Sequence, residues 1–325
     1  MGNSDVIQVK KSRFSDSKLG GLVLFSAFYL AAFIAGWAAQ KYLLPELVIP
    51  AADSLPVGMA ERIKALFAAD RLLLHLFVFD IVATVVIYIF SCIIHNASLY
   101  DAYWSLTPFV MLLPVVIGRY DRLSVFAIVF FAVFSVWSWR LTGNWIVTFG
   151  GTDWIDWRYR MYHDRFPALY PVINFFGIQM MPTLLVFAGM IPAIIALDGG
   201  KMTALSLIGD AVLLAGVSLE FFADRDVHAF LEENRGRMTV CDRGLWGHSR
   251  HPNYLGEITV WFGVYIACTA SNPSNFFAFP GCLLMIFLFE VISIPMMEKR
   301  QLSRRPDYAG YRKRVSRLIL LPERK

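Results

Sequence analysis

The chain has 325 residues, of which 57% are hydrophobic and only 17% are charged, and its mean hydropathy is +0.53. These values exclude an ordinary water-soluble globular protein. The formal net charge of +5 comes from basic residues beside apolar segments, and no nucleic-acid-binding module surrounds them. We therefore expect membrane lipids, and no nucleic acid, as partners.

Apolar segments long enough to cross a bilayer recur along the whole chain. A transmembrane helix needs about 20 apolar residues to cross roughly 30 Å of hydrocarbon. About eight segments qualify, the third and seventh being short: Gly20–Leu44, Leu72–His95, Tyr103–Gly118, Leu123–Leu141, Pro171–Leu197, Met202–Phe222, Tyr254–Ala270 and Phe276–Met297. The sequence predicts an all-α, polytopic transmembrane helical bundle.

Basic residues gather on one side of these segments. Most of the 30 Lys and Arg residues fall before the first segment, in 140–170, in 223–253 and after Met297. With eight spans these stretches share one side, which the positive-inside rule assigns to the cytoplasm. A seven-span chain would put one basic end outside. We expect both termini in the cytoplasm, with the protein in the endoplasmic reticulum if eukaryotic and in the inner membrane if bacterial.

The chain reads as one membrane domain with two tails. We assign 1–19 to a cytoplasmic N-terminal tail, 20–298 to the transmembrane domain, and 299–325 to a basic cytoplasmic tail that contributes to a cofactor site. The four cysteines show no C-x-x-C spacing, and the six histidines are scattered. The sequence therefore predicts neither a disulfide framework nor a metal site.

Polar residues concentrate at the predicted cytoplasmic ends of the spans, where ionisable groups are costly and point to function. The first group lies in 98–108 and 137–145, where Asp101 and Arg140 would be neighbours. The alternative is a surface ion pair worth about 1 kcal/mol or less. In the second group, Glu220 and Asp224 lie four residues apart on one helix face, which favours a site with a cation or a hydrogen-bonding ligand between them.

The third polar group is the most informative. Pro252 suits the first turn of a helix, and Arg250 and His251 precede it. A helix start with free N–H groups beside a cation binds anions such as phosphate. Asn253 and Glu257 share one face of the same helix. The alternative, a basic loop on lipid headgroups, accounts for the arginines but not for Asn253 and Glu257.

These residues carry a family resemblance. The sequence GLWGHSRHPNYLGE at 244–257, with Ala223 and Asp224 before it and NRGR at 234–237, resembles the steroid 5α-reductase-like family, in particular its DUF1295 branch. The resemblance is strong from Glu220 onward and weaker back to Trp137. It implies an NADPH-dependent enzyme that reduces a C=C bond of a lipid, steroid or isoprenoid-like substrate entering from the bilayer.

The resemblance also implies roles for individual residues. It puts a polarising carboxylate at Asp101, together with Arg140 and Tyr103. The cofactor would contact Asp224, Arg235, Arg237, Arg243, Arg250, His251, Asn253, Tyr254, Glu257, Tyr308 and Tyr311. The substrate would contact Trp104, Trp137, Glu220 and Glu290.

One position departs from the family pattern. The steroid reductases have a catalytic tyrosine three residues before an arginine, whereas this chain has Trp137 before Arg140. An indole cannot supply the phenolic proton. Either Tyr100 or Tyr103 replaces it, or the polarising step differs, so the resemblance supports the cofactor better than a steroid substrate.

Alternatives remain open at this point. R-H-P-x-Y before a span, with Glu298, Tyr308 and Tyr311 after the last one, also resembles isoprenylcysteine carboxyl methyltransferase-like proteins, which use S-adenosylmethionine. A non-catalytic lipid-binding protein is a further alternative. The tail 297–322 is either a cap over the cofactor or an interfacial helix, and the aromatic loop 150–167 is either an interfacial helix or a lid.

Overall fold

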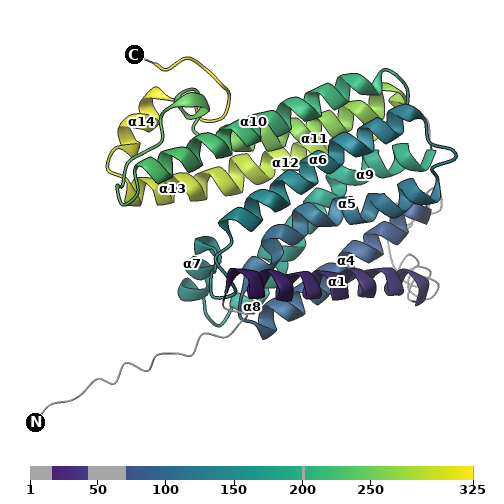
Figure 1. The fold of residues 1–325 in the computed structure, drawn as a ribbon, viewed down its shortest axis with the longest axis horizontal. Coiled ribbons are helices and arrows are strands. Elements are labelled where there is room, and N and C mark those ends of the chain that lie inside the picture. The colour runs from purple at the N-terminus through teal and green to yellow at the C-terminus, as the bar shows by residue number, and fades with distance from the viewer. Residues whose placement is uncertain (1–16, 43–70, 200–201, 325) are drawn as a thin grey trace, which may run out of the picture.

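A computed structural model describes residues 17–42, 71–199 and 202–324. The first half of the fold is built from α1 (Lys18–Tyr42), α4 (Arg71–Ile93), the 3₁₀-helix η2 (Ala97–Leu99), α5 (Tyr100–Gly118), α6 (Val125–Thr148), α7 (Trp157–Arg165), α8 (Tyr170–Val172), the π-helix η3 (Ile173–Met180) and α9 (Met181–Gly199). Figure 1 shows these helices as the lower part of an elongated bundle.

The second half contains α10 (Ser206–Glu233), the 3₁₀-helix η4 (Gly244–Gly247), α11 (Pro252–Ala270), the 3₁₀-helix η5 (Pro273–Ala278), α12 (Pro280–Phe287), the π-helix η6 (Leu288–Ser293), α13 (Ile294–Arg304) and α14 (Tyr308–Arg314). α12, η6 and α13 follow one another as a single long rod beside α10 and α11 (Figure 1).

The structure confirms the predicted fold class. Seven described helical stretches are long and apolar enough to cross a membrane: Lys18–Tyr42, Leu72–Ile93, Ala97–Gly118, Val125–Thr148, Tyr170–Gly199, Ser206–Glu233 and Asn275–Arg304. The seventh predicted segment forms as α11 but is not among them. It packs against α10, α9 and α12, so protein covers its polar residues and little of its surface needs to be apolar.

The helices α10 and α11 pack antiparallel with their backbones almost in contact. Gly209 and Gly216 on α10 are spaced like Gly256 and Gly263 on α11, seven residues apart. A Cβ atom at Gly216 would lie 2.7 Å from the Gly256 carbonyl oxygen, and one at Gly209 would collide with the backbone of Ala267. Small residues at such a spacing let two membrane helices approach closely. The pair therefore has one possible register.

The described ends of the chain meet at one end of the bundle. Lys18, at the start of α1, donates a hydrogen bond from Nζ to the carbonyl oxygen of Val147 near the end of α6, at 2.8 Å. The tail helix α14 lies at that same end, on the left of Figure 1, together with α7 and the end of α10. The start of α1, the end of α10 and the tail are thus brought to one end of the bundle.

A glycine substitution tests the close helix contact. Gly216→Ala should lower the free energy of unfolding by about 1–3 kcal/mol, because its methyl group has no space between the two backbones. Gly143→Ala on α6 is the matched control. No atom lies within 4 Å of the Cβ that this substitution adds, so it should raise the free energy of unfolding by about 0.4–1 kcal/mol. Thermal unfolding in detergent measures both, and equal effects would contradict the packing argument.

Candidate functional site

The C-terminal tail folds back onto the loop between α10 and α11. Ser249 and Ser316 form a parallel β-bridge, and the Arg250 backbone N–H donates to the Ser316 carbonyl oxygen at 2.8 Å. The Tyr311 hydroxyl donates to the Trp246 carbonyl oxygen at 2.7 Å. Tyr308 and Tyr311 are only 3% and 2% exposed. The tail therefore covers this loop, and we call its segment 308–316 the cap.

The cap, the loop and three helix ends enclose a cavity of about 190 Å³. It lies between the end of α10, the start of α11, α13 and α14, with aliphatic residues such as Val227 and Met297 in its wall. Residues predicted to contact the cofactor line it from both the loop and the tail: Arg250, His251, Asn253, Tyr254, Tyr308 and Tyr311. The sequence prediction thus identified a set of residues that the fold brings together.

Several polar groups in this cavity are available to a ligand. The buried Tyr308 hydroxyl makes no hydrogen bond of ordinary geometry to a described residue, although it lies in the electrostatic range of Arg250. Burial raises the pKa of Tyr308 to about 12, so it remains a donor. The side chains of Asn253 and Arg305 also line the cavity, and neither has a hydrogen-bond partner among the described side chains. An amide, a phenol and a guanidinium suit a polar, anionic ligand.

Arg250 holds the cap in place. Its guanidinium donates to Glu298 at 2.8 Å, to the Arg312 carbonyl oxygen at 2.9 Å and to the Val315 carbonyl oxygen at 2.6 Å. With these acceptors in place, Arg250 shapes the cavity wall, and its charge is already neutralised by Glu298. Arg250, the main cation of the predicted phosphate site at the start of α11, is therefore already paired with protein groups.

His251 is neutral in this wall. Burial lowers the pKa of His251, although Glu298 lies 3.4 Å from its Nε2 and favours protonation. Its ring stacks on Tyr254, with centroids 5.5 Å apart and planes at 5°. A neutral, stacked imidazole contributes a flat surface to the cavity rather than a positive charge.

The other predicted phosphate contacts lie away from the cavity. Arg235 and Arg237 are exposed on the loop. Arg243 donates to Glu233 at 2.6 Å and its guanidinium lies over the Phe230 ring. The residues that sequence reasoning missed are Gln301 and Arg305, which line the cavity from one face of α13 and its C-cap. Their spacing of four residues, which places both on one helix face, could have identified them in the sequence.

A buried ionic network lies deeper in the bundle. Arg140 on α6 donates to Asp224 at 2.9 Å and to Glu220, both on α10. The Arg140 side chain is 12% exposed and that of Glu220 is 2% exposed. The prediction that Glu220 and Asp224 need a cation between them is met by Arg140. Since ionisable groups inside a membrane domain are costly, this network is either functional or essential for packing.

Glu257 completes the network from α11. One carboxylate oxygen accepts from the Trp137 indole at 3.1 Å and the other from the Trp261 indole at 2.9 Å. Glu257 also lies in electrostatic contact with Glu220. The unusual Trp137 therefore has a structural role, because it donates to a buried carboxylate. Trp137 packs edge-to-face against Trp104 and is fully buried.

Asp101 and Arg140 lie on helices that pack against each other, α5 and α6, as expected, but the two residues do not pair with each other. Asp101 lies in the first turn of α5 and accepts a hydrogen bond from the Tyr159 hydroxyl of α7 at 2.6 Å. Arg158 lies 3.9 Å away. Arg140 is instead drawn to α10, which presents two carboxylates to it. The partner of Asp101 was missed because α7 is far from it in sequence.

Two further predicted residues lie in other surroundings. The Tyr103 hydroxyl is 3.2 Å from Thr84 Oγ1 and 3.5 Å from a carboxylate oxygen of Asp80, inside the bundle. Glu290, predicted to touch substrate, forms an ion pair with Arg317 of the tail at 3.2 Å. Neither residue lines the cavity under the cap.

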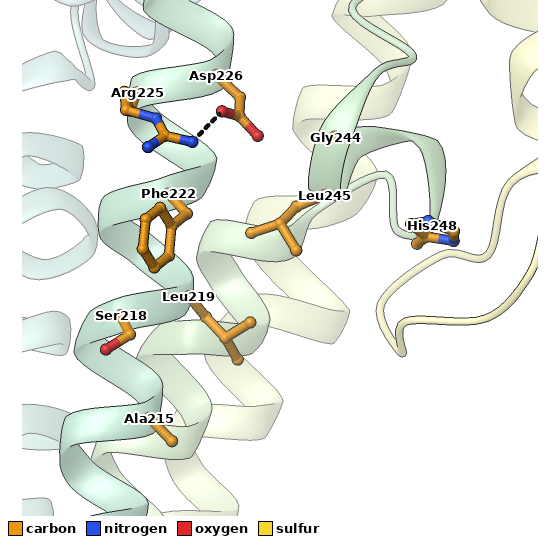
Figure 2. Close-up of a pocket in the computed structure, with 9 residues that line it drawn as sticks. All are labelled: Ala215, Ser218, Leu219, Phe222, Arg225, Asp226, Gly244, Leu245 and His248. Atoms are coloured by element: carbon orange, nitrogen blue, oxygen red, sulfur yellow. Dashed lines mark hydrogen bonds and ion pairs between the residues drawn. The ribbon is translucent and has the colours of Figure 1, made fainter.

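A second hollow lies on the outer face of α10 and carries none of the predicted residues. Figure 2 shows Leu219 and Phe222 of α10 facing Leu245 of the loop, with Arg225 bonded to Asp226 above them. That ion pair measures 3.1 Å. This face is opposite to the one that carries Glu220 and Asp224, so α10 separates the groove from the ionic network. No group of three or more metal-ligating side chains occurs in the described part of the chain.

Removal of the buried cation tests the network. Arg140→Gln should lower the free energy of unfolding by about 3–5 kcal/mol, because it leaves the carboxylates of Glu220 and Asp224 uncompensated. Arg140→Lys should lower the free energy of unfolding by less than Arg140→Gln does. Arg122→Gln, on a loop, is the control and should change stability by less than about 0.5 kcal/mol. Chemical unfolding in detergent measures these differences, and a loss at Arg140 no larger than the control would contradict the network.

Comparison with known proteins gives one match. A family model described as a protein of unknown function, DUF1295, matches residues 87–315, most of the chain. The match includes the cavity under the cap, the ionic network and the Asp101–Tyr159 pair. No curated protein and no solved structure matches the chain. The protein belongs to the DUF1295 family.

Proposed function

We propose that this protein is an NADPH-dependent membrane reductase that reduces a C=C bond, conjugated to a carbonyl, in a lipid, steroid or isoprenoid-like substrate. The observation that carries the proposal is the cavity under the cap, where residues of the reductase-like motif and of the tail converge. The ionic network gives further support. It lies next to the cavity, since Trp246 of the cavity wall donates to the Ala223 carbonyl oxygen, directly before Asp224. The assignment of both features to a reductase rests on the resemblance to the steroid 5α-reductase-like family.

The residues of the cavity suit parts of the cofactor. Arg305 would neutralise a phosphate, Asn253 would hydrogen-bond an amide or ribose, and the Tyr308 hydroxyl would donate to another oxygen of the cofactor. The cavity of about 190 Å³ is smaller than the roughly 300–1,000 Å³ typical of ligand sites. NADPH would therefore displace side chains of the wall. When bound, it supplies the hydride.

The Asp101–Tyr159 pair is our candidate for the acid. Reduction of an enone needs a proton donor at the carbonyl oxygen while the β-carbon receives hydride. Tyr159 supplies a phenol where Trp137 supplies none, and burial together with the charge of Asp101 raises its pKa, so the hydroxyl holds its proton. The pair is near the cavity, because Arg300, which is next to the cavity residue Gln301, lies over the ring of Trp157 on the helix that carries Tyr159. In the structure the hydroxyl donates its one proton to Asp101 at 2.6 Å. To act as the acid it would turn that proton to the substrate carbonyl oxygen, and Asp101, after taking up a proton from water, would donate to the phenolate left behind.

A methyltransferase is the second candidate. Glu298 bonds to Arg250 and lies against His251, so the elements of the R-H-P-x-Y pattern meet in the structure. Tyr308 and Tyr311 lie in the same cavity. A compact cavity also suits S-adenosylmethionine, which is smaller than NADPH. Binding of NADPH or of S-adenosylmethionine distinguishes the two functions.

Ligand-induced stabilisation tests the cofactor. At about 100 times its dissociation constant, a ligand raises the free energy of unfolding by about 2.7 kcal/mol. We expect this of NADPH, less of NADH, and no effect of S-adenosylmethionine on the detergent-purified protein. Asn253→Ala and Tyr308→Phe should weaken NADPH binding, whereas Tyr120→Phe, an exposed tyrosine, should not.

The alternative outcomes identify the other functions. Stabilisation by S-adenosylmethionine alone would make the protein a methyltransferase. No response to any of the three would favour a non-catalytic lipid-binding protein, and unchanged NADPH affinity in both cavity variants would place the cofactor elsewhere.

Turnover tests the acid. Asp101→Asn and Tyr159→Phe should each lower kcat at least about 100-fold while NADPH affinity stays unchanged, because the pair is proposed to act on the substrate carbonyl. Tyr162→Phe on the same helix is the matched control. NADPH oxidation is followed with a panel of steroid, sterol, prenyl and fatty enones. Wild-type kcat in both variants would exclude the pair as the proton donor.

A further inference from the structure

A separate cavity of about 620 Å³ opens between α7 and α13. Arg160 and Met161 of α7 and Trp154 before it form one wall, and Arg300 of α13 forms the other. The Arg300 guanidinium lies over the Trp157 ring, 4.2 Å from its centroid, so this contact joins the two halves of the bundle. None of these residues lines the cavity under the cap.

Unpaired positive charge dominates this cavity. Neither Arg160 nor Arg300 forms an ion pair with any described side chain. Arg304, Arg305 and Arg158 are like charges near Arg300, and Asp156 is an opposite charge near it. Asp164 is the acidic residue of the cavity lining.

These carboxylates offset only part of the positive charge. Asp156 accepts from Arg158 at 2.8 Å. Asp164 lines the cavity and lies 3.2 Å from the His163 ring, which is charged only when protonated. The lining therefore carries two arginines against one carboxylate, and this excess positive charge favours the binding of an anion. The cavity is therefore electrostatically incomplete.

The position of the cavity along the membrane normal favours a lipid as the source of that anion. The helical stretch Asn275–Arg304 has 30 residues and so extends about 45 Å, against roughly 30 Å of hydrocarbon. Its charged end, with Arg300, must project into the headgroup layer. Trp154 and Trp157 are of the type that anchors proteins at this layer.

We propose that the cavity between α7 and α13 binds the phosphate headgroup of an anionic glycerophospholipid, through Arg160 and Arg300. Met161 and Trp154 would contact the glycerol and the first acyl carbons. The volume of the cavity is much larger than a free phosphate requires, and a free phosphate would make no contact with the apolar wall. The groove on α10 in Figure 2 is a weaker anion site, because its Arg225 is already paired with Asp226. The bound lipid would join α7 to α13 whether or not the protein is a reductase.

Equilibrium binding of short-chain lipids to the full-length protein in detergent tests the proposal. Dioctanoyl phosphatidylglycerol should bind, and dioctanoyl phosphatidylcholine should bind at least about tenfold more weakly, since its headgroup has no net charge. The double variant Arg160→Gln with Arg300→Gln should lower the affinity for phosphatidylglycerol about tenfold or more.

The matched control removes the same charge from the same two helices. Arg165 and Lys299 are exposed and do not line the cavity, so Arg165→Gln with Lys299→Gln should change the affinity less than about threefold. Arg160→Glu alone keeps the contact between Arg300 and Trp157 and should also abolish the preference for the anionic lipid.

Two results would overturn the proposal. Equal losses in both double variants would mean that general surface charge attracts the lipid. Displacement of phosphatidylglycerol by millimolar inorganic phosphate, or equally tight binding of phosphate alone, would assign the cavity to a soluble anion. NADPH binding is measured on the same variants, so failure of this site is distinguishable from failure of the proposed cofactor site.

Discussion

The close antiparallel contact of α10 and α11 is the constraint on which the rest of the structure depends. Without side chains at Gly209, Gly216, Gly256 and Gly263, two backbones approach to a distance that no other residue permits. The register that results puts the Glu220 side chain against Gly256, one residue from Glu257. Carboxylates from two helices are thus forced together, and Arg140 of α6 and the two indoles provide the groups that neutralise or hydrogen-bond them.

The same contact positions the cavity at the end of the bundle. Because α10 ends where α11 begins, the loop between them stays at this end and its hydrogen-bonding groups face the tail. Arg250 then holds the tail through two backbone acceptors, and the tail closes the cavity with Tyr308 and Tyr311. A site built from three segments distant in sequence is well suited to control access of a ligand, since movement of the tail alone would open it.

Much of the fold was predictable from hydropathy, because the membrane admits few backbone arrangements. The helices and the polar span ends were identified in that way, whereas the cavity residues between Arg250 and Tyr311 were identified from the family resemblance. The partners were not predictable. An acidic partner of Arg140 was expected on α5 and lies on α10 instead. The Tyr159 that bonds to Asp101 lies on the short helix α7, whose position against α5 no hydrophobic periodicity determines.

The sequence by itself determined that this is a membrane protein with helices of given extent, and that its polar residues lie at one end of them. It also determined the glycine spacing that makes α10 and α11 approach. Only the tertiary structure decided which charges neutralise one another, that Trp137 donates to Glu257, and that Arg160 and Arg300 line one cavity. The physical reason is that hydrophobicity acts residue by residue along the chain, whereas hydrogen bonds and ion pairs depend on distances that arise only after the helices have packed.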